Sequence, residues 1–167
     1  MTDYSVVGTF RSLNWPKSRG GLNSSGRVVP SIRSVEMTFT VLGPAVPKPR
    51  MTRSDRWNER PAVMRYREWA DLVRSEVTGD PTKKLNGEDF FGIVAFFHCP
   101  IPKSWSAVDK AAHAGRLHQS RPDADNVTKG LLDAIFEEDK FITVQIGFKF
   151  WCEEGSEPRT DFFLLAL

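Results

Sequence analysis

The sequence contains few cysteines and no long hydrophobic segment. Its 167 residues include only two cysteines, Cys99 and Cys152, which is too few for a disulfide scaffold or a cysteine-rich zinc site. The longest nearly unbroken apolar run, residues 90–97, is far shorter than the about 18 to 20 residues that cross a bilayer. The first thirty residues also lack the apolar block of a signal peptide. We therefore expect reduced thiols, a cytoplasmic location and no membrane partner.

The amino-acid composition predicts one folded domain with an N-terminal extension. Hydrophobic residues make up 40% of the chain, which is enough for a core in a domain of about 100 to 200 residues. Residues 1–34 are rich in Ser, Gly, Arg and Asn and show no apolar period, as flexible segments do. We expect a flexible basic N-terminal extension over 1–34 and a folded domain over 35–167.

The spacing of apolar residues predicts the elements of that domain. Alternation predicts strands at 35–42 and 143–151, and an apolar run predicts another at 160–167. A continuous apolar stretch at 90–99 predicts a central strand covered on both faces. Helical spacing predicts helices over 66–77 and from about 125 to 136, and we expect a short helix over 102–114. The prolines between residues 44 and 61 predict an exposed irregular loop. This order of elements indicates an α/β (mixed α+β) fold with one small mixed sheet packed against helices.

Charge is unevenly distributed along the chain. The net charge is only +2, but it is +4 over residues 1–34, +5 over 44–67 and −4 over 137–167. Such segregation favours a surface that binds a polyanion beside an acidic site. The residues predicted to contact DNA phosphates are Lys48, Arg50, Arg53, Arg56, Arg60 and Arg121.

Residues 121–140, RPDADNVTKGLLDAIFEEDK, carry the strongest chemical pattern. Helical spacing places Val127, Gly130, Leu131, Ala134 and Ile135 on a buried stripe, with Asp125, Lys129 and Asp133 on the opposite face. Carboxylates from Asp123, Asp125 and Asp139 can hold Mg²⁺, and Lys129 can then meet a phosphate oxygen beside the ion. Asp133 is an auxiliary carboxylate. A helix cap at Asp123 or Asp125 and a solvated ion-pair face explain the same residues without catalysis.

The segment PDADNVTKGLLDAIF and the following EED resemble the signature of the RusA family of Holliday junction resolvases. GPAVPKPR at 43–50 is similar to the family's proline-rich segment after the first strand. The resemblance covers about residues 35–167. It implies a homodimeric, Mg²⁺-dependent endonuclease, with Mn²⁺ as a substitute, that nicks four-way DNA junctions in recombination and repair. It also implies that Asp123, Asp125, Asp139 and Lys129 are essential. The acidic pair here is Glu-Asp, so Glu138 can share or replace the role of Asp139.

Three further points stay open on the sequence alone. Leu132 and Phe136 flank the polar helix face, so they are candidates for a dimer interface or for burial under a neighbouring loop. Pro122-Asp123 with Glu138-Asp139-Lys140 formally matches a PD-(D/E)xK nuclease, although a helix fills the interval. A non-catalytic DNA-binding or regulatory module on the same fold is the third reading.

Overall fold

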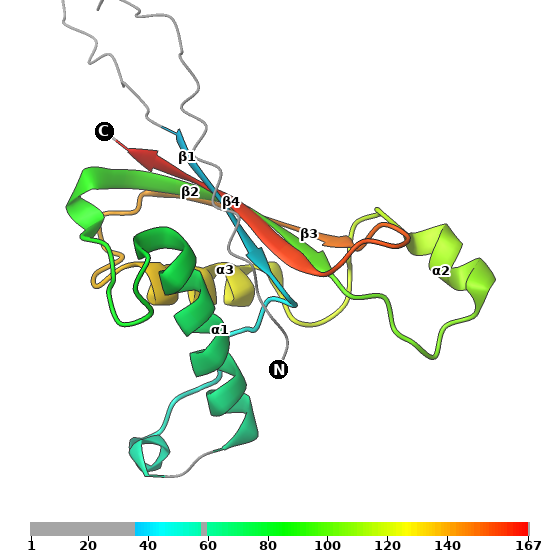
Figure 1. The fold of residues 1–167 in the computed structure, drawn as a ribbon, viewed down its shortest axis with the longest axis horizontal. Coiled ribbons are helices and arrows are strands. Elements are labelled where there is room, and N and C mark those ends of the chain that lie inside the picture. Colours follow the sequence, from blue (N-terminus) through cyan, green and yellow to red (C-terminus); the bar gives the residue numbers. More distant parts are fainter. Residues whose placement is uncertain (1–35, 58–59, 167) are drawn as a thin grey trace, which may run out of the picture.

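The computed structural model describes residues 36–57 and 60–166, so the predicted N-terminal extension lies outside the described residues. Four strands form one mixed sheet in the order β1-β4-β2-β3 (Figure 1). They are β1 (Glu36–Leu42), β2 (Phe90–Cys99), β3 (Val144–Trp151) and β4 (Arg159–Ala166). β2 pairs with β3 in parallel, and the other two pairs are antiparallel. The predicted fold class and the central position of 90–99 are confirmed.

The helices are α1 (Pro61–Thr78), α2 (Ala107–His113) and α3 (Ala124–Ile135), with short 3-10 turns η1 (Arg53–Arg56) and η2 (Gly87–Asp89). α1 begins earlier than its apolar spacing predicted, because Pro61 occupies the first turn, where a missing N–H costs nothing. It ends at Gly79, whose φ of 73° is left-handed. α2 is shorter than the predicted segment 102–114.

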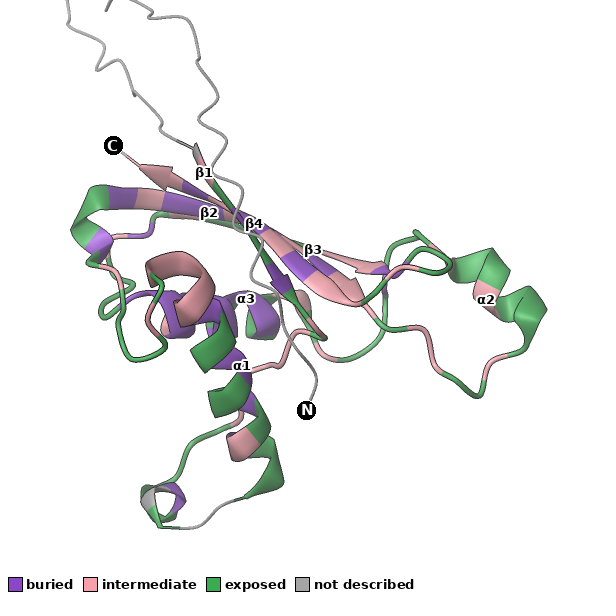
Figure 2. Cartoon of the chain, viewed as in Figure 1, coloured by how far each residue is buried: buried purple, intermediate pink, exposed green. Residues whose placement is uncertain are grey.

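α1 and α3 pack on one face of the sheet and build the core there (Figures 1 and 2). The predicted buried stripe of α3 is confirmed, since all of its members are buried. Leu132 and Phe136 are each only 1% exposed and belong to the same core. Of the two alternatives predicted for these side chains, burial is the one that the structure shows, so neither is available for a dimer interface.

The opposite face of the sheet carries no helix in the described part of the chain (Figure 1). Residues of β2 alternate accordingly, with Ile93, Ala95 and Phe97 fully buried and Phe96 only half-buried. The Phe96 ring stacks on Phe148, with centroids 5.3 Å apart. The prediction that β2 is covered on both faces thus holds for one face, and aromatic packing among neighbouring strands partly covers the other. We call this second surface the outer sheet face.

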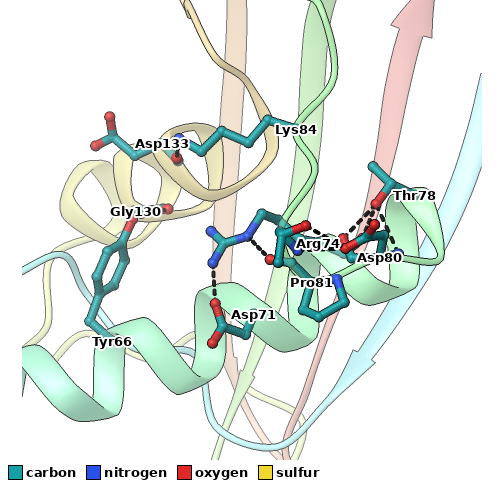
Figure 3. Close-up of polar contacts among 10 residues, drawn as sticks. Tyr66, Asp71, Arg74, Thr78, Asp80, Pro81, Lys84, Gly130 and Asp133 are labelled. Atoms are coloured by element: carbon teal, nitrogen blue, oxygen red, sulfur yellow. Dashed lines mark hydrogen bonds and ion pairs between the residues drawn. The ribbon is translucent and has the colours of Figure 1, made fainter.

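Polar contacts fix α3 against α1 (Figure 3). The Tyr66 hydroxyl on α1 donates a hydrogen bond to the Gly130 carbonyl on α3 at 3.0 Å. Burial raises the pKa of Tyr66, so this hydroxyl stays protonated and able to donate. Lys84 Nζ donates to the carbonyl oxygens of Asp133 and Phe136 at 2.6 and 3.2 Å, which satisfies the end of the helix. No helix of the described residues is long and apolar enough to span a membrane.

Candidate active site

Two predicted site carboxylates lie at the start of α3. Asp123 occupies the N-cap position with extended backbone, but its side chain makes no capping hydrogen bond. Asp125 lies in the first turn, and both residues are exposed. The positive end of the helix dipole stabilises negative charge at this position. The helix start thus orders both backbones, while the carboxylate oxygens remain accessible to a ligand.

β3 fixes the segment that leads into the helix. Lys149 Nζ donates to the backbone carbonyl of Ser120 at 2.6 Å and also to that of Pro122. This ammonium group lies 3.2 Å from the His118 Nδ1 as well. Sequence reasoning missed Lys149 because its partners are distant in the chain. The available signal was that Lys149 is the one charged residue in its strand.

A small hollow lies beside Asp125, between the start of α3 and β3. Its lining residues are Ala124, Asp125, Thr128, Gln145 and Gly147. The close approach of helix and strand requires the glycine, because a Cβ at Gly147 would be 2.2 Å from the Thr128 Oγ1. The Thr128 hydroxyl in turn donates to the Ala124 carbonyl at 2.8 Å. Gln145, a residue that sequence reasoning did not select, therefore lines the same hollow as Asp125.

The polar face of α3 divides into an accessible part and a paired part. Lys129 follows Asp125 by one helical turn and is exposed, so its ammonium group is available to an anion. Asp133, a further turn along, lies 2.8 Å from Lys48 Nζ. Backbone packing supports this pair, since a Cβ at Gly130 would lie 3.1 Å from the backbone nitrogen of Lys48. Asp133 therefore holds the loop after β1 against the helix.

The remaining acidic candidates lie beyond the other end of α3. Glu138 and Asp139 are exposed in the segment that follows the C-cap Phe136, and Glu138 forms an ion pair with Lys140. A twelve-residue helix, about 18 Å long at about 1.5 Å per residue, separates this segment from Asp123. Among residues 36–57 and 60–166, no three His, Cys, Asp or Glu side chains gather closely enough to hold a metal ion. The chain thus brings Asp123 and Asp125 together at one helix end without Asp139.

The second group of predicted residues lies on a projection that we call the basic arm, namely residues 48–57 with Arg60. Its centre is a buried carboxylate, Asp55, which is 2% exposed. Arg60 binds both oxygens of Asp55, through Nε at 2.5 Å and Nη2 at 2.6 Å. Thr52 donates to the same carboxylate from its backbone N–H and its hydroxyl at 2.5 and 2.9 Å. These contacts, led by the one from Arg60, hold the pKa of Asp55 well below its usual range.

The irregular segment that the prolines predicted is confirmed over residues 44–52, and the structure adds the short turn η1 and hydrogen bonds that hold the arm in place. Arg60 Nη2 also donates to the Arg50 carbonyl at 2.9 Å, and Arg67 Nη2 donates to the Asp55 carbonyl at 2.9 Å. The guanidinium of Arg60 is thus engaged within the arm. Arg50 and Arg53 are exposed on it, as is Arg121 just before the start of α3.

Exposed carboxylates are groups that can hold a catalytic metal ion, and exposed lysine and arginine side chains are groups that can contact nucleic-acid phosphates. The family model described as endodeoxyribonuclease RusA matches residues 43–160. The chain belongs to this endodeoxyribonuclease family, as the segments 43–50 and 122–139 predicted. Neither the curated proteins nor the solved structures yield a match to the chain.

Proposed function

We propose that this protein is a Mg²⁺-dependent, structure-selective endonuclease that resolves four-way DNA junctions. The observation that carries the proposal is the accessible group of Asp123, Asp125 and Lys129 at the start of α3. This group lies inside the range that matches the endodeoxyribonuclease family. Nearby exposed arginines supply the positive charge that a DNA backbone requires, because carboxylates alone would repel phosphates.

Asp123 and Asp125 would hold the metal ion. Mg²⁺ is commonly bound through one or two protein carboxylates together with water and substrate phosphates, so two adjacent carboxylates suit it without a third. When bound, the ion supplies an activated water and offsets charge on the phosphate, and Mn²⁺ is expected to substitute for it. The roles of Asp139 and Glu138 in metal binding stay predictions from the sequence. Because both residues lie beyond the far end of α3, a substitution of Asp125 is the sharper test of the metal site.

The protein's own groups would position the DNA. Lys129 would offer its ammonium to an oxygen of the phosphate under attack, where negative charge grows. Arg121 would contact the flanking backbone at the same helix end, and Arg50 and Arg53 would contact it from the basic arm. Lys48 would affect DNA binding indirectly, because its ion pair with Asp133 holds the base of the basic arm against α3.

A homodimer is part of the proposal, since two symmetric cuts in a four-way junction suit two identical sites related by a two-fold axis. The surface that we assign to it is the outer sheet face. Ile146 and Phe148 are each 41% exposed there, and Phe163 and Phe96 pack beside them with ring centroids 6.1 Å apart. Apolar surface of this kind is typical of interfaces between subunits.

The dimer is tested by sedimentation. We expect Phe148→Glu to convert the dimer to a monomer, because a charge on this face would be buried without a partner. Val108→Glu is the matched control, since Val108 is 78% exposed on α2. A wild-type monomer at micromolar concentration, or equal effects of the two variants, would contradict the assignment of this face.

The central experiment measures cleavage of a synthetic four-way junction and of a linear duplex with the same arm sequences. We expect symmetric nicks in the junction with Mg²⁺ and none with a chelator. Asp125→Asn should lower the cleavage rate at least about a hundredfold, because it removes a charged ligand. Asp89→Asn, at an exposed aspartate of η2, is the matched control.

The outcomes separate the candidate functions. Undiminished cutting by Asp125→Asn would remove the site assignment. Junction binding without any cutting by the wild-type protein would favour a non-catalytic DNA-binding module. Equal cutting of junction and linear duplex would keep the nuclease and reject its selectivity for branched DNA.

A further inference from the structure

The basic arm presents an aromatic ring to solvent. Trp57 follows η1 as its C-cap residue, and its backbone N–H donates to the Ser54 carbonyl at 3.0 Å. Its side chain is 86% exposed, more than any other large hydrophobic side chain in the described part of the chain. The other tryptophans described contrast with it, since Trp69 and Trp151 are buried and Trp105 is half-buried. An indole gains considerably from burial, so its exposure here calls for a partner.

The position of Trp57 is set by the buried network of the arm. Asp55, two residues earlier, is held by Thr52 and Arg60, and its carbonyl accepts from Arg67 on α1. The backbone that carries the indole is therefore fixed to the helix from which the arm projects. Because the backbone is held, only the two side-chain torsions of the indole have to be ordered when it binds a ligand, and the cost in conformational entropy is small.

The charge around Trp57 indicates the chemistry of that ligand. Asp55 and Glu59 are the only carboxylates between residues 44 and 67, against seven lysines and arginines, and the guanidinium of Arg60 neutralises Asp55. Arg50 and Arg53 leave the exposed surface positive. An aromatic face next to guanidinium groups matches a nucleobase with its adjoining phosphates, since stacking tolerates any base while the cations bind the backbone.

We propose that Trp57 stacks on a nucleobase left unstacked at the branch point of a DNA junction. Within a linear duplex both faces of each internal base are already covered, whereas a branch point exposes a face to an incoming ring. The inference rests on the proposed function, because it takes branched DNA as the substrate. In this proposal Trp57 contributes to the preference for branched over linear DNA. It does so from the basic arm, apart from the start of α3.

The test measures binding without cleavage, by fluorescence anisotropy in chelator, on a four-way junction and on the matched linear duplex. We expect Trp57→Ala to weaken junction binding about tenfold, as for the loss of one base stack, and duplex binding by less than about twofold. Trp57→Phe should recover part of the affinity, because a smaller ring still stacks. Met51→Ala is the matched control, since Met51 is an exposed apolar residue on the same arm.

A second readout places the contact. 2-Aminopurine at the branch point should change its fluorescence on binding wild-type protein, and the change should be lost with Trp57→Ala. Equal weakening on junction and duplex, or no weakening, would overturn the proposal. Loss of the dimer in Trp57→Ala would overturn it too, in favour of a contact between subunits.

Failure of this inference can be told from failure of the proposed function. If the wild-type protein binds junctions through Trp57 but does not cut them, the inference stands and the nuclease proposal fails. If it cuts junctions and Trp57→Ala binds them normally, only the inference fails.

Discussion

The start of α3 and the basic arm are held in place by different forces. The helix start is set by close backbone packing, with Gly147 against Thr128 and the Gly130 backbone against Tyr66 and the loop at Lys48. The arm has little apolar burial and depends on one buried carboxylate, Asp55, and its hydrogen bonds. The groups that would act on a phosphodiester thus sit on the rigid core, while the groups that would hold DNA sit on a polar projection. Substitutions should therefore affect the two regions separately.

The largest expected effect on folding comes from filling the contact between α3 and β3. Gly147→Ala should lower the free energy of unfolding by about 1–3 kcal/mol, because the new Cβ overlaps the Thr128 Oγ1. Adding Thr128→Ala should recover part of the loss, since it removes the overlapping atom. Urea denaturation of the four proteins of this double-mutant cycle measures the coupling. Additive losses would show that the overlap is not the cause.

Asp55→Asn should affect the arm and leave the core intact. The amide cannot accept from both nitrogens of Arg60 as the carboxylate does, so the arm loses its central ion pair. We expect DNA affinity to fall about two- to tenfold through lost preorganisation, with an unchanged urea midpoint. Hydrogen exchange of residues 52–57 should accelerate. A global loss of stability equal to that of Gly147→Ala would remove the distinction between the two regions.

The arginines of the arm and Lys48 should differ in the salt dependence of binding. Arg53→Ala should lower the slope of log affinity against log salt by about 1, the expectation for one phosphate contact. Lys48→Ala should change that slope less, because the Lys48 ammonium already pairs with Asp133 at 2.8 Å. Titrations of a labelled junction at several salt concentrations measure both. Equal slopes for the two variants would show that Lys48 exchanges its partner for DNA.

Mild acid should weaken the core before the arm. Burial lowers the pKa values of His98 and His118 in the folded protein. Just below the ordinary histidine pKa of about 6.5, these two side chains therefore bind more protons in the unfolded state than in the folded state. The free energy of unfolding should therefore fall as pH drops below about 6.5, and less so in His98→Gln. The depressed pKa of Asp55 keeps its ion pair charged at pH 5. Urea midpoints and arm hydrogen exchange at pH 5 and 7 test this contrast.

Much of the local structure followed from periodicity. The stripe of Val127, Leu131 and Ile135 predicted both the extent of α3 and the accessible positions of Asp125 and Lys129. For Leu132 and Phe136 periodicity left two alternatives, because their exposure depends on which neighbours reach the sides of the helix, and the structure buries both. Periodicity also overlooked Asp55, since a lone acid among arginines gives no periodic signal.

The sequence by itself determined the order of elements, the start of α3 and the family, because all three depend on short-range spacing of residue types. Only the tertiary structure decided which charged side chains form ion pairs and which side chains face solvent. It paired Lys48 with Asp133 and Arg60 with Asp55, left Trp57 in solvent, and placed Asp139 at the opposite end of α3 from Asp123. The physical reason is that ion pairing and exposure depend on contacts between segments distant in the chain, which no local pattern encodes.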